Sequence, residues 1–175
     1  MSTQSTALPG HFHESRATVV LVDIRRMIGI IEELGSEHRY VLFLEDFYSL
    51  CHDAIEVSGG AVIKYIGDSC LATFGEDDIV HAVDAVKAIR DGFPALCEKY
   101  GVHTTGVRAN IVIDEVISGE FGPTRQRDIM GKAVGAVMVM EGSGISLSES
   151  AYRKLPSANR SGWRKQGGKV VYVMK

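Results

Sequence analysis

The sequence predicts an α+β domain with a ferredoxin-like βαββαβ core, in which an antiparallel sheet carries helices on one face. Strand-like and helix-like segments follow one another in the order strand, helix, hairpin, helix, strand. The length of 175 residues suits one domain, and 45% hydrophobic with 23% charged residues is the balance of a chain that buries a core. We expect a flexible tail over residues 1–15, one domain over residues 16–175, and C-terminal helices and a β-hairpin after the core.

The first strand is predicted from a run of β-branched residues, and the first helix from the spacing of its apolar residues. Residues Ala17 to Val22 form a run rich in β-branched side chains that ends in Asp23, which is typical of a buried central strand. From Ser36 to Ser58, apolar residues recur at intervals of three and four. This pattern predicts a long amphipathic helix, with Ser36 as its N-terminal cap and Gly59-Gly60 as its stop.

A hairpin, a second helix and a further strand complete the core. Ala61 to Ile66 and Ser69 to Phe74 are short strand-like runs, and the two residues between them, Gly67-Asp68, suit a tight turn. Asp77 to Tyr100 repeats the helical period, and we expect Pro94 to kink or divide this helix. The stretch from Gly106 to Phe121 is rich in strand-forming residues.

Further elements follow the core. Gly131 to Glu141 has the pattern of a helix, and Ser148 to Leu155 that of a short helix with a serine cap. Trp163 to Met174 is expected to form a hairpin that turns at Gly167-Gly168.

Charge and composition exclude several classes of partner. The net charge is −3 and the isoelectric point is near 6.1, so no positive field attracts nucleic acid or an anionic membrane. The longest run without a polar residue or glycine, Ala136 to Met140, is far shorter than the roughly 20 apolar residues of a membrane span. The cysteines, Cys51, Cys70 and Cys97, are odd in number and form no C-x-x-C pair, which favours reduced thiols and a cytoplasmic location.

Two acidic residues are the first candidates for chemistry. Asp23 ends the first strand and Asp68 lies at the tip of the predicted hairpin, so the two can converge on one spot. Paired carboxylates hold hard divalent cations through oxygen. The alternative is that each aspartate serves as an ordinary turn residue.

The order and spacing of three motifs resemble the class III nucleotidyl cyclase domain. They are Val-Leu-Val-Asp23-Ile24, then Gly59-Gly60-Ala-Val-Ile-Lys64-Tyr-Ile-Gly67-Asp68-Ser with Ala-Thr-Phe-Gly after it, and finally Arg127-Asp128-Ile-Met-Gly131. The resemblance extends roughly from Ala17 to Leu155.

The resemblance implies a fold, a reaction and a set of residues. The family has the core predicted above and builds its sites at the interface of a dimer, where the 3′ oxygen of a nucleoside triphosphate attacks the α-phosphorus and pyrophosphate leaves. Asp23 and Asp68 would hold two Mg²⁺ or Mn²⁺ ions, assisted by the Ile24 carbonyl group. One ion would lower the pKa of the attacking hydroxyl and the other would neutralise the triphosphate.

The family selects adenine with a lysine and an aspartate, which match Lys64 and Asp128 of the other subunit. A lysine donates to a ring acceptor of adenine, and an aspartate accepts from the amino group, so the pair favours ATP over GTP. The alternative is a solvated Lys64 and an Asp128 that pairs with Arg125 or Arg127.

Two regions depart from the family pattern, and a third offers several matches. The family carries an asparagine that orients the ribose and an arginine that stabilises phosphate charge; Gly135 and Val139 stand at these positions on one helix face. The phosphate-binding turn Gly-Phe-Thr is replaced by Arg26-Met27-Ile28, where Arg25 and Arg26 could compensate as phosphate ligands. A lysine near the C-terminal hairpin also helps in the family, and Arg164, Lys165 or Lys169 could take that role.

The leading hypothesis is a cytoplasmic, homodimeric class III cyclase that converts ATP to 3′,5′-cyclic AMP with low activity. Losing one preorganised donor typically costs on the order of 10²–10³ in rate, so the changes at Gly135 and Val139 matter. The alternatives are a cyclase for another nucleoside triphosphate, a degenerate pseudo-cyclase that binds nucleotide as a regulatory module, and a ferredoxin-like interaction domain that binds none.

Overall fold

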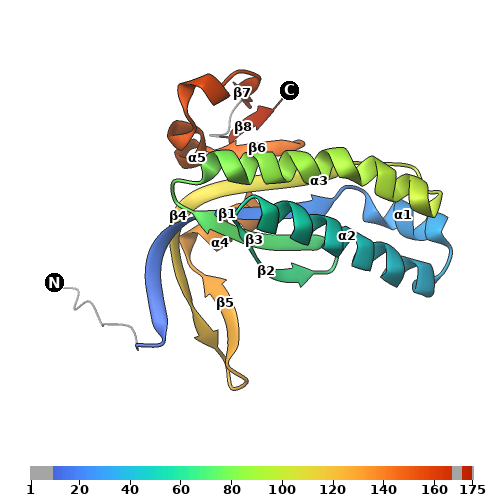
Figure 1. Cartoon of the computed structure of the whole chain (residues 1–175), viewed down its shortest axis with the longest axis horizontal. Coiled ribbons are helices and arrows are strands. Elements are labelled where there is room, and N and C mark those ends of the chain that lie inside the picture. Colours follow the sequence, from blue (N-terminus) through green and yellow to red (C-terminus); the bar gives the residue numbers. More distant parts are fainter. Residues whose placement is uncertain (1–9, 167–170, 175) are drawn as a thin grey trace.

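A computed structural model describes residues 10–166 and 171–174 of the chain (Figure 1). The strands are β1 (Phe12–Ile24), β2 (Ala61–Ile66), β3 (Ser69–Gly75), β4 (Val107–Phe121), β5 (Gln126–Met130), β6 (Ile145–Ser148), β7 (Trp163–Lys165) and β8 (Val171–Met174). The helices are α1 (Met27–Leu34), α2 (Glu37–Val57), α3 (Ile79–Tyr100), α4 (Lys132–Val139), α5 (Glu149–Lys154) and the single 3₁₀ turn η1 (Ser157–Asn159). Among these described residues, no helix combines the length and the apolar character needed to cross a membrane.

The strands form one sheet in the order β2-β3-β1-β4-β6-β8-β7, and β5 pairs with β4 outside this path. The part β2-β3-β1-β4 is antiparallel throughout and has the strand order of a ferredoxin-like core. The predicted α+β fold with this core is therefore confirmed. The C-terminal extension adds β6, which is parallel to β4, and the antiparallel pair β7 and β8.

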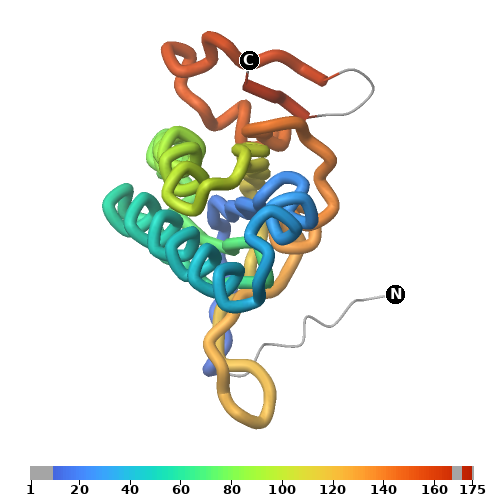
Figure 2. Tube along the Cα trace, turned by 90° about the vertical axis from the view of Figure 1, so that its right-hand side faces the viewer, coloured from blue at the N-terminus to red at the C-terminus, as the bar shows by residue number. Residues whose placement is uncertain are grey.

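Alternation along β1 divides the apolar core between the two faces of the sheet. Val20 and Val22 pack with α2 and α3, whereas Val19 and Leu21 pack on the opposite face with α4. Figure 2 shows α2 and α3 together on one side of the molecule. The expectation that the core helices lie on one face is confirmed for α2 and α3, and the additional helix α4 buries its apolar residues Ala133 and Val137 against the other face.

The two predicted serine caps are present, whereas the helix that contains Pro94 is not divided. The Ser36 Oγ accepts a hydrogen bond from the Arg39 backbone N–H at 3.3 Å, and Ser148 Oγ accepts one from Ala151 N–H at 3.2 Å, so both serines cap their helices. Pro94 does not divide α3, which runs as one helix of 22 residues. The predicted turn at Gly167-Gly168 lies outside the described residues.

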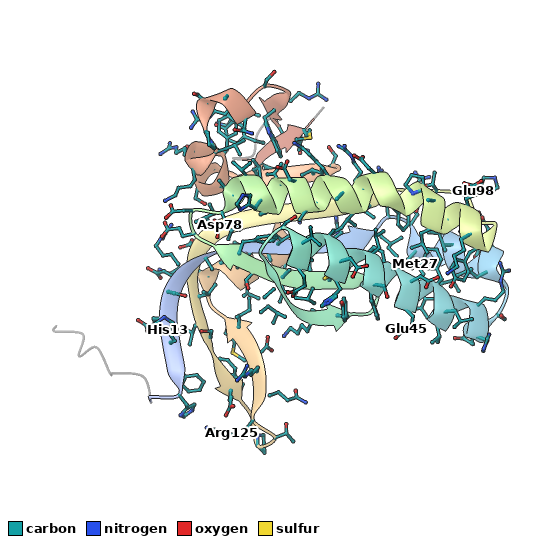
Figure 3. All side chains as sticks on the ribbon, viewed as in Figure 1. His13, Met27, Glu45, Asp78, Glu98 and Arg125 are labelled. Carbon is teal, nitrogen blue, oxygen red and sulfur yellow. The ribbon has the colours of Figure 1, made fainter. Side chains whose placement is uncertain are left out.

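Five of the described elements differ from the prediction, two in their boundaries and three because they were not predicted. β1 begins at Phe12, inside the expected tail, because Phe12 to Arg16 pair with the far half of β4. These residues and the β4–β5 hairpin form an arm that extends from the body, with Arg125 at its end (Figures 1 and 3). Helix α1 and the strands β5 and β6 were not predicted as separate elements, and α4 ends at Val139, two residues before the expected Glu141.

Candidate functional site

The two predicted acidic residues meet at one end of the core sheet. Asp23 is the last residue but one of β1, and its cross-strand partner on β3 is Ser69, the residue after Asp68. The Ile24 backbone N–H donates to the Asp68 carbonyl at 3.2 Å, which ties the end of β1 to the hairpin turn. The two carboxylates are close enough that the charge of Asp68 contributes to the pKa of Asp23.

A cation that the sequence did not indicate lies on the other side of Asp23. Arg108 of β4 is directly opposite Asp23 in the sheet. Its Nε and Nη2 both donate to Oδ2 of Asp23, at 2.9 and 2.7 Å. Burial raises the pKa of Asp23, and the charge of Asp68 adds to this, whereas the bonds from Arg108 oppose it.

Asp23 and Arg108 line a pocket of about 360 Å³. The rest of its lining is Ile24, Arg25, Arg26 and the loop Gly142, Ser143, Gly144. Arg25 is held by its backbone N–H, which donates to the Gly106 carbonyl at 3.0 Å. Arg26 precedes α1 with a φ of +53°, a left-handed conformation that favours glycine. The backbone therefore keeps a glycine-like turn here although its side chain is arginine.

Tyr48 of α2 holds the turn that carries Asp68. Its Oη donates to the Gly67 carbonyl at 2.5 Å. The ring of Tyr65 from β2 stacks on that of Tyr48, with centroids 4.1 Å apart and planes inclined by 17°. The Tyr65 Oη in turn donates to the Tyr48 carbonyl at 3.2 Å, so the long helix and the hairpin are joined at two points.

The second predicted pair, Lys64 and Asp128, also comes together. The Lys64 Nζ on β2 lies 2.5 Å from Oδ2 of Asp128 on β5. The other carboxylate oxygen, Oδ1, accepts from the Ile129 backbone N–H at 2.8 Å. The alternative in which Asp128 pairs with Arg125 is wrong, because Arg125 pairs with Glu120 at 3.3 Å. A pocket of about 600 Å³ opens beside Asp128, lined by His11, Val62, Ile63, Ser118, Gly119, Glu120, Arg127, Asp128 and Ile129.

Asp23 and Lys64, one residue of each pair, belong to the sheet face opposite α2 and α3. Asp23 follows Val19 and Leu21 in the alternation of β1, and these two residues pack on that face. Lys64 is opposite Leu71, which packs on the same face. A surface that contacts this face of the sheet would therefore meet one residue of each pair.

Helix α4 lies over this face and carries the two positions that depart from the family pattern. Gly135 is exposed, and a Cβ atom there would meet nothing within 4 Å. Val139 is 77% exposed. Together with Met130 and Met138 it gives α4 and the strand before it an apolar, solvent-facing surface. Gly131 is the cap residue before the helix; its φ is +121° and a Cβ there would lie 2.9 Å from the Glu115 carbonyl oxygen, so this position requires glycine.

The remaining sequence-predicted residue, Lys165, lies on β7 at the edge of the sheet. It lines a separate pocket of about 370 Å³ with Ser143, Arg164, Gln166 and Val173. Ser143 also lines the pocket of Asp23 and Arg108, so the two pockets adjoin at this residue. Arg164 and Lys165 therefore line the adjoining pocket and are not among the residues that line the pocket of Asp23 and Arg108. Lys169 lies outside the described residues.

The donor set at Asp23 and Asp68 fits a small divalent cation bound together with a phosphate. In the described part of the chain there is no cluster of three or more His, Cys, Asp or Glu side chains that could hold a metal ion. Two carboxylates and the Ile24 carbonyl are oxygen ligands, the type that Mg²⁺ and Mn²⁺ prefer. Magnesium is commonly held by one or two carboxylates plus substrate phosphates, and two carboxylates agree with that pattern.

Sequence reasoning missed Arg108 and Tyr48. Both act through partners that are distant along the chain: Arg108 is 85 residues from Asp23, and Tyr48 is 19 residues from Gly67. The signal for Arg108 was its place one residue after the start of the strand next to β1, which becomes informative only when the register of the two strands is known.

Comparisons with known proteins agree with this architecture. No family model matches the chain. A curated adenylate cyclase from Anabaena cylindrica is 28% identical over 155 residues, which are 80% of this chain and 31% of that protein. The structure of a bacterial light-regulated adenylyl cyclase superposes with a TM-score of 0.78 and 19% identity, over 94% of this chain and 53% of the other. The guanylyl cyclase Cya2 gives a TM-score of 0.77 and 20% identity, over 91% of each chain.

The sequence relative and the solved structures differ in how much of their own length this chain covers. The chain spans about a third of the length of the curated relative and about half of the light-regulated enzyme. The solved structures are similar in fold, and adenylyl and guanylyl cyclases match about equally well. The resemblance found in the motifs is therefore confirmed by a relative in sequence and by the fold.

Proposed function

Because the chain has the fold of class III nucleotidyl cyclase catalytic domains and resembles an adenylate cyclase in sequence, we propose that it is a nucleotidyl cyclase with ATP as its first candidate substrate. The observation that carries this proposal is that Asp23 and Asp68 lie at the same end of the sheet, while Lys64 forms an ion pair with Asp128. In the reaction, the 3′ hydroxyl loses its proton, its oxygen forms a bond to the α-phosphorus, and the bond to pyrophosphate breaks.

Each residue has a role in this proposal. Asp23, Asp68 and the Ile24 carbonyl would hold two Mg²⁺ or Mn²⁺ ions. Such ions lower the pKa of the attacking hydroxyl and neutralise triphosphate charge. Arg25 and Arg26 border the same pocket and would bind phosphate groups, with Lys165 approaching from the adjoining pocket.

Lys64 and Asp128 would recognise the base. The ammonium group has donors beyond the one used for Asp128, and it could donate to a ring nitrogen of adenine. The Asp128 carboxylate could accept from the adenine amino group. Guanine presents a carbonyl and an N–H at that edge, so the pair favours ATP, and GTP is the alternative substrate.

We propose a homodimer as the working form. The resemblance implies that the metal-binding and base-recognising pairs of one site come from opposite subunits. The exposed apolar side chains Met130, Met138 and Val139 support this, because a surface of this kind is commonly covered by a partner. We also propose a cytoplasmic location, which the three buried cysteines, free of disulfides, support.

A specific observation favours a second candidate, a pseudo-cyclase that binds nucleotide without turnover. The exposed face of α4 offers neither a donor nor a charge at Gly135 and Val139, where the family has an asparagine and an arginine. Without these groups the transition state loses two stabilising contacts. Low activity or none is the consequence.

One experiment separates the candidates. The protein is incubated with Mn²⁺ and each of the four ribonucleoside triphosphates, and the products are identified by mass spectrometry. A cyclic nucleotide that is absent from the Asp68→Asn variant supports the cyclase, and the base of that product names the substrate. Metal-dependent ATP binding without any cyclic product supports the pseudo-cyclase. Failure to bind any triphosphate leaves the interaction domain as the remaining hypothesis.

A further inference from the structure

An asparagine is buried in the apolar part of β4. Asn110 is 2% exposed, and its neighbours along the strand, Ala109 and Ile111, are buried residues of the core beneath α2 and α3. Because side chains alternate along a strand, Asn110 points to the other face of the sheet, where Val112 packs with α4. Burying an amide costs stability unless hydrogen bonds satisfy it. The reason for an asparagine here therefore lies in its contacts on the α4 face.

The Asn110 side chain ends helix α4. Its Nδ2 donates to the Val137 carbonyl at 3.2 Å and to the Met140 carbonyl at 2.7 Å, so the two N–H groups of the amide match two acceptors. Carbonyl groups in the last turn of a helix have no partner within the helix. The amide supplies one, and the chain leaves the helix at Met140, whose backbone is extended.

The loop that follows α4 packs directly on Asn110. A Cβ atom at Gly142 would lie 1.8 Å from Oγ of Ser146 and 3.3 Å from Oδ1 of Asn110, so the loop backbone touches both side chains. Ser146 of β6 is the residue opposite Asn110 in the sheet. Gly142 and Gly144 both line the pocket that contains Asp23. One wall of this pocket is therefore built on Asn110.

We propose that Asn110 is a positioning residue for the phosphate side of the site. By ending α4 and supporting the loop from Gly142 to Gly144, it keeps the pocket beside Asp23 formed before a nucleotide binds. A pocket that is already formed binds its ligand more tightly, because binding does not have to order the loop. The inference rests on the proposed function, since it takes this arginine-lined pocket as the place where the triphosphate binds.

Asn110→Ala removes the amide and should weaken binding of phosphate groups. The affinity for 3′-deoxy-ATP with saturating Mn²⁺, measured by isothermal titration calorimetry, should fall about 10-fold. This compound lacks the attacking hydroxyl, so it reports binding without turnover. Inorganic tripolyphosphate with Mn²⁺ has no base, and its affinity should fall by the same factor. In turnover of ATP, KM should rise by a similar factor while kcat changes less than about twofold, because Asn110 does not touch the reacting atoms.

Hydrogen exchange tests the support of the loop without any ligand. The Ala109 backbone N–H donates to the Gly144 carbonyl at 3.0 Å, so its exchange rate reports whether the loop stays on β4. Exchange at Ala109 should accelerate in Asn110→Ala. If the alanine variant does not fold, Asn110→Ser takes its place, because serine leaves a smaller cavity and also lacks the amide.

Two controls separate this effect from a general loss of stability. Ser146→Ala removes the neighbouring buried hydroxyl, which forms no hydrogen bond within the described residues. Val86→Ala leaves a cavity under α3, on the other face of the sheet, and lowers stability away from the pocket. Both variants should retain the wild-type affinities. Urea unfolding measures the stability of each variant.

The outcomes distinguish this inference from the proposed function. If exchange at Ala109 is the same in wild type and Asn110→Ala, the amide does not support the loop and the inference is wrong. If exchange accelerates but both affinities stay at wild-type values, or if Val86→Ala loses as much affinity, Asn110 has only a structural role and the inference is also wrong. If folded wild type binds no triphosphate, the proposed function fails, and the inference fails with it.

Discussion

Tyr48 Oη donates a hydrogen bond of 2.5 Å to the carbonyl of Gly67, so a residue in the middle of α2 fixes the turn that carries Asp68. The neighbouring stack with Tyr65 fixes the ring of Tyr48 in turn. The position of Asp68 therefore depends on α2, which packs on the sheet face opposite α4.

Tyr48→Phe should reveal this dependence. The substitution removes one hydrogen bond and should lower the free energy of unfolding by about 1 kcal/mol. Because the turn loses its anchor, amide hydrogen exchange at Gly67 and Asp68 should accelerate, and Mn²⁺ affinity should fall. Tyr40→Phe, which removes a hydroxyl from the same helix, is the control. Unchanged exchange at the turn would show that Tyr48 does not position Asp68.

Asp23→Ala and Asp68→Ala should each abolish metal-dependent binding of ATP while the fold remains. Each variant removes one of two carboxylates from a site at the end of the sheet, where Asp68 is in a turn and Arg108 can move into solvent after losing Asp23. Binding is measured with Mn²⁺ by calorimetry, and circular dichroism verifies the fold. Asp53→Ala, on the exposed side of α2, is the control. Wild-type affinity in both variants would remove the metal-site assignment.

The protein should sediment as a dimer at high concentration with nucleotide and metal present. Met138→Glu places a charge on the apolar surface of α4 and should shift the equilibrium toward monomer, because an interface does not readily bury an unpaired charge. Val57→Glu is the control, since Val57 is exposed at the end of α2. A monomeric mass for wild type under these conditions would contradict a site shared between subunits.

Gly135→Asn combined with Val139→Arg should raise cyclase turnover, on the order of 10²-fold, by restoring the donor and the charge that the family uses. The structure favours the experiment, because space is open at Gly135 and Val139 faces solvent, so neither new side chain is forced into the core. Replacing glycine within a helix also removes an unfavourable residue. Gly135→Asn with Val139→Leu is the control without the charge. If the folded double variant binds ATP but turns over no faster than wild type, α4 does not face the substrate.

Stability should fall at alkaline pH because of the half-buried Tyr65. Burial raises the pKa of Tyr65 to about 12, whereas the pKa of a tyrosine in the unfolded chain is about 10. Between these values the unfolded chain has lost a proton that the folded chain retains, so the free energy of unfolding decreases as pH rises. Urea unfolding of Tyr65→Phe from pH 9 to 12 should show a smaller decrease than wild type. An equal decrease in both proteins would exclude Tyr65 as a cause.

The fold could be predicted from the sequence because its elements have clear periods. The first strand, the two long helices and the hairpin each show one regular pattern of apolar residues, and their order identifies the core. Helix α1 was missed because it has only eight residues and exposes Ile28 and Ile31, which blurs its amphipathic pattern. Strand β5 was missed because Gln126, Arg127 and Asp128 make it more polar than a typical strand.

The site could be predicted in part. The motifs indicated the two pairs, since Asp23, Asp68, Lys64 and Asp128 follow one another at spacings that resemble a known family. The contact of Arg108 with Asp23 depends on the register between β1 and β4, and a shift of one residue would place Arg108 on the other face. No local pattern encodes that register.

The pairing of β1 with β4 also sets when the site can form during synthesis. Asp23 leaves the ribosome 85 residues before Arg108, which at about 5–20 residues per second is a delay of several seconds. During this time the apolar β1 has no partner on its β4 side, and an unpaired strand edge promotes aggregation. Nascent chains arrested before β4 should therefore depend on chaperones and lack the pocket, whereas chains released after β5 contain both pairs.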